Sequence, residues 1–202
     1  MQKEVELSDS KVKLMMGQIQ PHFIFNSLQA IQELCAENPE KAEQSVHDFS
    51  KYLRGNLDAL SCTHLITFEK ELSHIRAYIA LEQADPGRNF EMIYDLEVKD
   101  FKVPALSVQP MVENAVRHGL TSCRENGRVI LQTRETEKEY LIRVMDNGKG
   151  FKGITQKQKE RQQVGLENVR TRLEVQCRGR LEIKSSDRGV VVTIHIPKML
   201  ED

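Results

Sequence analysis

The amino-acid sequence predicts an α+β protein in which a helical N-terminal domain is followed by an α/β sandwich. Residues up to about 84 show helical periodicity without strand patterns. After Asp85, Pro86 and Gly87 break the chain, strand-like and helix-like segments alternate. A chain of 202 residues is long enough for one or two domains with a hydrophobic core. We therefore expect a helical domain over residues 1–84 and a second domain over residues 85–202.

Two long helices come first in the predicted helical domain. One runs from about residue 5 to 36 and ends where Asn38 and Pro39 mark a turn. The next carries an unbroken apolar stripe at helical spacing: Ala42, Val46, Phe49, Leu53, Leu57 and Leu60. Helices joined by so short a turn are antiparallel neighbours. Because two such stripes bury too little surface for independent stability, we expect a second copy of the chain to complete a four-helix bundle.

A third helix is predicted to begin after Thr67. The Thr67 hydroxyl suits an N-cap, and Glu69 and Glu71 in the first turn favour the positive end of the helix dipole. Its apolar residues are Leu72, Ile75, Ile79 and Leu81. The helix ends at the break after residue 84, where we place the domain boundary.

The second domain is predicted to contain five strands and two helices. The strands are residues 89–96, 128–134, 140–145, 180–186 and 190–196, and the helices are residues 104–119 and 165–177. Between Gly150 and Gly165 the chain is polar and nearly free of apolar residues. This segment is either a lid over a ligand or a solvated surface loop.

The motif VENAVRHG, residues 112–119, gathers polar groups in the first helix of this domain. The i, i+4 spacing places four of them on one helical face: Glu113, Asn114, Arg117 and His118. The opposite face is apolar or small and can pack: Val108, Met111, Val112, Ala115 and Gly119.

A second motif, DNGKG at residues 146–150, follows two predicted strands further along the chain. Asp146 leaves the end of a strand and enters a turn. Gly148 and Gly150 in that turn can adopt backbone angles closed to other residues and let a ligand approach the main chain. Asp-Asn-Gly is also ordinary turn chemistry, but together with the VENAVRHG cluster it predicts a nucleotide site.

In the helical domain the segment QIQPHFIFNSLQ, residues 18–29, stands apart. Pro21 crowds the carbonyl of Gly17, which predicts a kink one turn before His22. A polar stripe follows at helical spacing: Gln18, His22, Asn26, Gln29 and Glu33. His22 is thus expected to face outward with an amide one turn away. A lone histidine on a helix is more often structural or solvated, and we interpret the others as structural: His47, His64, His74 and His195. Arg170 and Arg172 are expected to be solvated.

Composition excludes several classes of protein. Charged residues make up 29% of the chain, but the net charge is only -1, so a nucleic-acid surface is not expected. Four cysteines, at positions 35, 62, 123 and 177, show no CxxC and no metal spacing, which suits reduced thiols in the cytoplasm. No apolar run approaches the roughly 18 to 20 residues of a membrane span, and no signal peptide opens the chain. The chain fits the cytoplasmic part of a longer membrane protein.

Four motifs in order resemble those of the LytS-like sensor histidine kinases over nearly the whole chain: PHFIFN, QPMVENAVRHG, DNGKG and GLENVRTRL. The resemblance implies a dimerisation and phosphoacceptor domain followed by an ATP-binding domain of the gyrase, Hsp90 and histidine-kinase type, with helices on one face of a mixed sheet. It implies ATP-dependent autophosphorylation, with transfer of the phosphoryl group to an aspartate of a response regulator. It further implies a homodimer that is the cytoplasmic part of a bacterial plasma-membrane sensor.

The resemblance also implies residue roles. His22 would be the phosphoacceptor. A further hypothesis, from its position one helical turn after His22, is that Asn26 orients a water for a reverse phosphatase activity. Asn114 would hold Mg²⁺ against the phosphates of ATP, with Glu113 as its acidic partner. Asp146 would bind the adenine amino group in a pocket shaped by Gly148 and Gly150. Gly165 would open the phosphate-side helix, whose first turn offers unpaired amides to an anion. The remaining nucleotide contacts would be Arg117, His118, Leu166 and Asn168.

Two positions depart from the resembled pattern. Many histidine kinases carry an acid directly after the phosphoacceptor, whereas this chain has Phe23, so Glu113 is only a candidate base. A second glycine usually lies two residues before Gly165, and here that residue is Gln163. Two alternatives stay open: an ATP-driven conformational machine of the gyrase or Hsp90 type, and a non-catalytic dimeric scaffold. Neither alternative requires a histidine at position 22 within PHFIFN.

Overall fold

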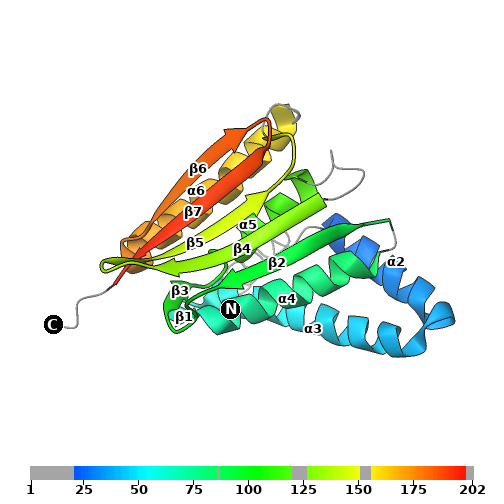
Figure 1. Cartoon of the computed structure of the whole chain (residues 1–202). Coiled ribbons are helices and arrows are strands. Elements are labelled where there is room, and N and C mark those ends of the chain that lie inside the picture. Colours follow the sequence, from blue (N-terminus) through cyan, green and yellow to red (C-terminus); the bar gives the residue numbers. More distant parts are fainter. Residues whose placement is uncertain (1–20, 86, 120–126, 151–155, 199–202) are drawn as a thin grey trace, which may run out of the picture. The chain divides into compact units, whose positions relative to one another are not determined.

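The computed structural model describes residues 21–85, 87–119, 127–150 and 156–198 (Figure 1). Contacts divide the chain into two compact units. One unit, here the helical unit, comprises residues 1–61 and 77–88, and the other, the sheet unit, comprises residues 62–76 and 89–202. The domain boundary expected between residues 84 and 85 stays a prediction.

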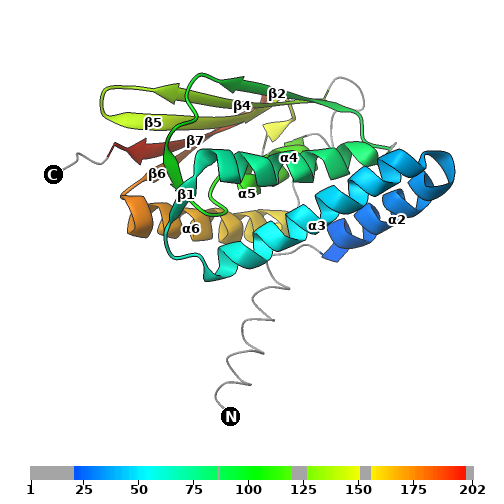
Figure 2. The same cartoon turned by 90° about the horizontal axis from the view of Figure 1, so that it is seen from below.

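The helical unit contains α2 (Pro21–Glu37) and α3 (Pro39–Ser61), which form an antiparallel hairpin (Figure 2). The turn between them is the predicted one. The Asn38 Oδ1 accepts a hydrogen bond of 3.0 Å from the backbone N–H of Lys41, and Pro39 is the first residue of α3. Asn38 therefore caps α3 in the way that asparagine favours. The part of the first helix expected over residues 5–20, with its kink at Gly17, lies outside the described residues.

The buried face of α3 differs from the predicted stripe. Val46 and Leu57 are 49% and 42% exposed, and Phe49 and Leu53 are half-buried. Apart from Tyr52, the residues that α3 buries within the unit are small or polar: Ala42, Ser45, Tyr52, Asn56 and Ala59. The larger apolar side chains of the predicted stripe lie outside this buried face.

Three aromatic rings close the core of the helical unit. The Phe23 ring of α2 lies 4.7 Å from Tyr52 and 5.1 Å from Tyr78, measured between ring centroids. All three side chains are buried. Tyr78 belongs to α4 (Phe68–Ala84), whose residues from Ala77 onward are part of this unit. The rings thus anchor the start of α2.

The sheet unit begins with a strand that the sequence did not predict. β1 (Leu65–Thr67) pairs antiparallel with β3 (Lys102–Pro104), with Ile66 opposite Val103. Strands of three residues are too short to show an alternating pattern, and the partner is distant in sequence. The expectation that the first 84 residues lack strands is therefore wrong at this point. Thr67 caps α4 as predicted, because its Oγ1 accepts from the N–H of Lys70 at 3.3 Å.

The predicted five strands form one mixed sheet (Figure 1). They are β2 (Phe90–Leu96), β4 (Gly127–Glu135), β5 (Glu139–Asp146), β6 (Arg180–Ser186) and β7 (Gly189–Pro197). The order is β2-β4-β5-β7-β6, and only β2 and β4 are parallel neighbours. Each predicted strand is present to within two residues at either end.

Both predicted helices of this unit begin elsewhere than expected. The segment 104–119 is helical only from α5 (Gln109–Asn114), which continues as a π-helical segment, η1 (Ala115–Gly119). Residues 105–108 form a buried turn instead. α6 (Gln156–Cys177) starts before Gly165. Its early part is rich in Gln, Lys, Glu and Arg, which are good helix formers although no apolar periodicity marks them.

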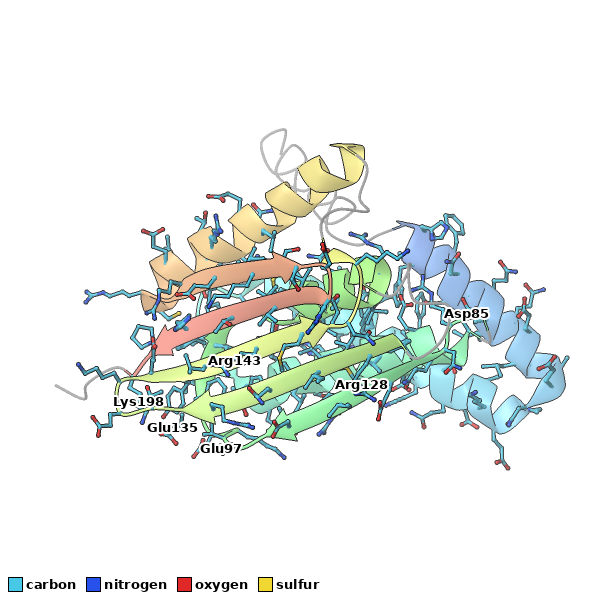
Figure 3. All side chains as sticks on the ribbon, turned by 45° about the horizontal axis from the view of Figure 1, so that its top comes forward. Asp85, Glu97, Arg128, Glu135, Arg143 and Lys198 are labelled. Atoms are coloured by element: carbon cyan, nitrogen blue, oxygen red, sulfur yellow. The ribbon has the colours of Figure 1, made fainter. Side chains whose placement is uncertain are left out.

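The core of the sheet unit lies between the sheet and α5, η1 and α6. Alternate residues of the strands face it, including Val129, Leu131, Ile142, Val144 and Ile194. The opposite face of the sheet carries polar side chains, among them Arg128 and Arg143 (Figure 3). Helices on one face of a mixed sheet are what the sequence predicts. Within the described residues we find no helix with the length and apolar character of a membrane span.

Candidate functional site

His22 lies in the first turn of α2 with its side chain exposed. Asn26, one turn further along, is half-buried, and its Nδ2 lies 3.1 Å from the Nδ1 of His22. Phe23 between them is buried in the aromatic core. The structure thus brings together the predicted imidazole and amide, and it leaves the other nitrogen of the ring, Nε2, on an exposed side chain.

Asp146 ends β5 and lies at the start of the predicted turn. Its Oδ1 accepts from the N–H of Gly148 at 2.9 Å and from the N–H of Val190 at 3.3 Å. Partial burial raises the pKa of Asp146, and the two backbone hydrogen bonds oppose this rise. Both bonds use Oδ1, so neither occupies Oδ2. A fixed carboxylate with one oxygen spare is a suitable acceptor for a ligand N–H.

Two glycines allow the backbone to close around Asp146. Gly150 has a φ of 63°, and a Cβ there would lie 2.2 Å from the carbonyl oxygen of Ser186. Gly189 has a φ of 124°, and a Cβ there would lie 1.8 Å from the carbonyl oxygen of Asp146. Gly150 is a predicted site residue. Gly189 was missed, because its position between two strands marks a turn but not its contact with Asp146.

Glu113 and Asn114 end α5, and both side chains are half-buried. The Nε2 of Gln109 donates to the Oε1 of Glu113 at 2.8 Å, and the Gln109 side chain is itself 1% exposed. Arg117 in η1 donates to the Oδ1 of Asn114 at 3.4 Å. The structure therefore groups Glu113, Asn114 and Arg117 as predicted, and adds Gln109. The side chain of His118 lies outside the described ones.

The residues predicted on the phosphate side fall inside α6. Gly165 does not open this helix, so the expectation that its first turn offers unpaired amides at Gly165 is wrong. Leu166 is half-buried and Asn168 is exposed. The side chain of Gln163 lies outside the described ones, so the effect of this departure stays a prediction. Residues 151–155 of the predicted lid or loop lie outside the described residues as well.

Arg172 differs from the expectation of a solvated side chain. It donates to the carbonyl oxygens of Ala105 at 2.5 Å and Leu106 at 3.1 Å. Arg170 is exposed, as expected, and its guanidinium lies 3.8 Å from the Glu167 carboxylate. Sequence spacing alone could not separate these two arginines, because the acceptor carbonyls of Arg172 lie more than sixty residues earlier in the chain.

Asp146 and the Asn114 group belong to one unit, in which η1 packs against β5. Together they offer two carboxylates, an amide oxygen and a guanidinium. These groups suit a nucleotide with a base, phosphates and an associated cation. The described residues contain no group of three or more His, Cys, Asp or Glu side chains that could hold a metal ion by themselves.

Comparison with known families agrees with this site. Residues 10–90 match the family described as Histidine kinase. Residues 104–200 match the family described as Histidine kinase-, DNA gyrase B-, and HSP90-like ATPase. The fold is similar to that of the histidine kinase domain of the Erythrobacter litoralis EL346 blue-light activated histidine kinase. That comparison has a TM-score of 0.51 at 15% identity and covers 96% of this chain and 95% of that one.

Relatives of known sequence point the same way. The chain is 32% identical to the Escherichia coli Sensor histidine kinase YpdA, over 93% of this chain and 34% of that protein. It is 34% identical to the Bacillus subtilis Putative uncharacterized protein YwpD, over 95% of this chain and 74% of that protein. It is 38% identical to the Staphylococcus aureus Sensor histidine kinase/phosphatase LytS, over 72% of this chain and 25% of that protein. The chain thus spans about a third of the first relative and a quarter of the last.

The fold and the site define a helical histidine kinase region followed by an ATP-binding domain of the gyrase, Hsp90 and histidine-kinase type. The chain belongs to the sensor histidine kinase family. The similarity to LytS confirms the resemblance seen in the four motifs.

Proposed function

We propose that this chain is the kinase region of a two-component sensor, in which His22 accepts the γ-phosphoryl group of ATP and then passes it to an aspartate of a response regulator. One observation carries the proposal. The His22 side chain is exposed and held by Asn26 at 3.1 Å, while Phe23 between them is buried. This arrangement presents one ring nitrogen to a partner. A conformational ATPase or an inert scaffold needs no such histidine.

Adenine is the proposed partner of Asp146. The ionised carboxylate would accept a hydrogen bond from the adenine amino group through Oδ2, because Gly148 and Val190 already bind Oδ1. Gly148 and Gly150 would line the base pocket, and Gly150 keeps the turn against Ser186 without a side chain. The fixed orientation of the carboxylate supports selection of an amino group at that position of the base.

Mg²⁺ is the proposed cation, and the residues present fit it. The amide oxygen of Asn114 is a hard oxygen ligand, and Mg²⁺ in kinases takes few protein ligands besides phosphate oxygens and water. When bound, the ion would neutralise phosphate charge. Glu113, the neighbour of Asn114 in the chain, would be its acidic partner and a candidate base. We assign the remaining nucleotide contacts to Arg117, His118, Leu166 and Asn168.

The tautomer of His22 decides which nitrogen can react. With the Asn26 Nδ2 against Nδ1, the Nδ1 would accept this hydrogen bond and the ring proton would lie on Nε2. A half-turn of the amide places its oxygen against Nδ1–H and leaves the Nε2 lone pair free for attack. In that tautomer the Nε2–P bond forms as the P–O bond to ADP breaks. The phosphorylated ring then loses its Nδ1 proton to solvent, which reaches this exposed side chain. Asn26 would also orient water when the phosphoryl group is hydrolysed in reverse.

A second copy of the chain is the proposed partner of the helical hairpin. The exposed or half-buried apolar side chains of α3 lie at helical spacing: Val46, Phe49, Leu53 and Leu57. On α2, Phe25 and Leu28 are 71% and 48% exposed. Packing these side chains against the same side chains of a second hairpin completes a four-helix bundle and removes them from water. We place the chain in the cytoplasmic part of a membrane sensor.

The test is autophosphorylation with γ-labelled ATP and Mg²⁺. We expect label on the protein that is stable to base and labile to acid, as a phosphoramidate is. His22→Gln should abolish it, and Asp146→Asn should reduce it through weaker ATP binding. His47→Gln, which changes an exposed histidine of α3, is the matched control and should keep the label. Label that persists in His22→Gln would refute the assignment. ATP binding or hydrolysis without any label would favour the scaffold or the conformational ATPase.

A further inference from the structure

We infer that Glu71 is a positioning residue for the nucleotide site, because its carboxylate holds the turn that leads into α5 and so fixes Asn114 and Glu113. This inference rests on the proposed nucleotide site and deepens it. Glu71 itself belongs to α4 and touches none of the proposed ATP ligands in the contacts of the described residues. Its action is therefore through the backbone of residues 106–109.

α5 is poorly able to hold its own position. It has six residues, and the side chain of its own N-cap residue, Val108, makes no capping hydrogen bond. Helices this short have little intrinsic stability, because the cost of nucleation is spread over few hydrogen bonds. Its C-terminal end passes into the π-helical segment η1 rather than into a regular helix. The position of Glu113 and Asn114 thus depends on the buried Met111 and Val112 side chains of α5 and on what holds the ends of this helix.

Glu71 supplies the missing cap from another helix. Its Oε1 accepts from the N–H groups of Val108 at 2.9 Å and Gln109 at 3.1 Å, and its Oε2 accepts from the N–H of Leu106 at 3.0 Å. The Glu71 side chain is 0% exposed. Burial raises the pKa of Glu71, and the three backbone hydrogen bonds and Arg172 act in the opposite direction. Because an N–H donor faces each oxygen, the deprotonated form matches these partners.

Arg172 holds the same turn through its carbonyl groups. It donates to Ala105 and Leu106, so the N–H of Leu106 binds Glu71 while its C=O binds Arg172. Leu106 has a φ of 53°, which is unusual for a residue with a side chain. The turn adopts this conformation between two charged groups from α4 and α6, and neither partner is close to it in sequence.

Gln109 connects the turn held by Glu71 and Arg172 to Glu113, the candidate base. Its backbone N–H binds Glu71 at 3.1 Å, and its side chain Nε2 donates to Glu113 at 2.8 Å. Glu71, Gln109 and Glu113 therefore form a continuous chain of hydrogen bonds from α4 to the candidate base. If the turn loses Glu71, α5 samples other positions, and ATP must first select the competent one. Apparent affinity falls by the fraction of molecules in that position, whereas the rate in the bound complex is kept.

The test is Glu71→Gln in the whole chain, with Glu69→Gln as the matched control. Glu69 lies on the same helix, its side chain is 56% exposed, and among the described residues it pairs only with Arg76. In Glu71→Gln one carboxylate oxygen becomes an NH₂ group that faces an N–H donor of the turn. Losing one hydrogen bond to a charged group predicts on the order of a 10-fold rise in the apparent KM for ATP. We expect kcat within about 2-fold of the wild type and both parameters unchanged in Glu69→Gln.

Measuring KM and kcat separately distinguishes a positioning role of Glu71 from a mere loss of folded protein. A variant that is only partly folded loses kcat in proportion and keeps its KM. A folded Glu71→Gln protein whose KM matches that of Glu69→Gln would overturn the inference, as would a loss confined to kcat. If Glu71→Gln does not fold, Arg172→Lys replaces it, with Arg170→Lys as control, and the same KM rise is required.

One measurement needs no variant. The amide protons of Leu106, Val108 and Gln109 should exchange with solvent as slowly as those of the central strands, since Glu71 holds all three in a buried site. Exchange at the rate of exposed turns would contradict the inference that Glu71 holds this turn. A wild-type chain that binds no ATP would refute the proposed function itself. A wild-type chain that binds ATP, beside a Glu71→Gln chain that binds it equally well, would refute this inference alone.

Discussion

Replacement of Gly189 by alanine tests whether the β6–β7 turn supports the adenine pocket. The added Cβ would lie 1.8 Å from the Asp146 carbonyl oxygen, and ordinary contact begins at 3.4 Å, so the turn must open by 3.4 − 1.8 = 1.6 Å. The φ of 124° is also closed to alanine without strain. Strain of this kind costs on the order of 1–3 kcal/mol. The hydrogen bond from Val190 to Asp146, which such a shift would break, adds about 1.5 kcal/mol.

We therefore expect Gly189→Ala to lower the free energy of unfolding by about 3 kcal/mol, which is about 12 °C in Tm for a domain of this size. Thermal unfolding followed by circular dichroism measures it, and ATP affinity should fall in the same variant. Gly165→Ala is the stability control. Apart from the backbone of its own helix, no atom of the described residues lies within 4 Å of the position of a Cβ at Gly165 inside α6, so alanine should stabilise by about 0.5–1 kcal/mol. A Gly189→Ala protein that melts within about 2 °C of the wild type would refute this reasoning.

Three further predictions concern the pocket, the hairpin and the phosphoacceptor. Burial raises the pKa of Asp146 above its ordinary value of 3.8. The folded state therefore binds the proton more tightly than the unfolded state. The Asp146 contribution to stability thus falls as the pH rises from its pKa in the unfolded state to its raised pKa in the folded state, and it is constant above that range. ATP binding needs the ionised form, so affinity should decline on acidification at a higher pH than for an ordinary aspartate. Titration of Kd with pH checks this, and Asp146→Asn should remove the dependence. Val46→Glu should weaken the homodimer by at least about 10-fold, since it buries a charge in the proposed interface between the two hairpins. Sedimentation equilibrium measures the dimer dissociation constant, with His47→Glu at an exposed position as the control. Equal dimerisation of both variants would contradict this interface. Asn26→Ala should leave ATP affinity unchanged and lower both the phosphorylation rate of His22 and the hydrolysis of phosphohistidine, by about 10-fold or more. Unchanged rates in a single-turnover assay would show that the amide has no role.

Local signals predicted much of the fold. The five strands of the sheet are seven to nine residues long, and Asn38 and Thr67 cap their helices through bonds to residues three positions away. Such features depend on neighbours in sequence, so a single sequence contains the information. The same holds for Asp146, whose partner Gly148 lies in the same motif.

Features that depend on distant residues could not be predicted in this way. β1 exists because β3 lies beside it, and a strand of three residues has no pattern of its own. Glu71 looked like a first-turn acid of α4, yet it caps a turn 35 to 38 residues later. Gly189 was an ordinary turn glycine until the structure placed it against Asp146. In each case the physical cause is a backbone contact between segments that only the folded chain brings together.

The first residues of the helices were predicted least accurately. The polar segment after Gln156 was expected to be a lid or a loop because it lacks apolar residues, but it contains good helix formers and joins α6. Residues 105–108 were expected to begin a helix, but the buried Glu71 and the half-buried Arg172 hold them as a turn. Propensity decided the first case and tertiary hydrogen bonds decided the second.

The most direct test of the central claim is the position of the phosphoryl group. The chain is incubated with ATP and Mg²⁺, kept at alkaline pH, and digested for mass spectrometry of the phosphorylated peptide. The account predicts a single phosphohistidine at His22, formed in the wild type and absent from Asp146→Asn at limiting ATP. A phosphoryl group on another residue, or none on a chain that binds ATP, would contradict it.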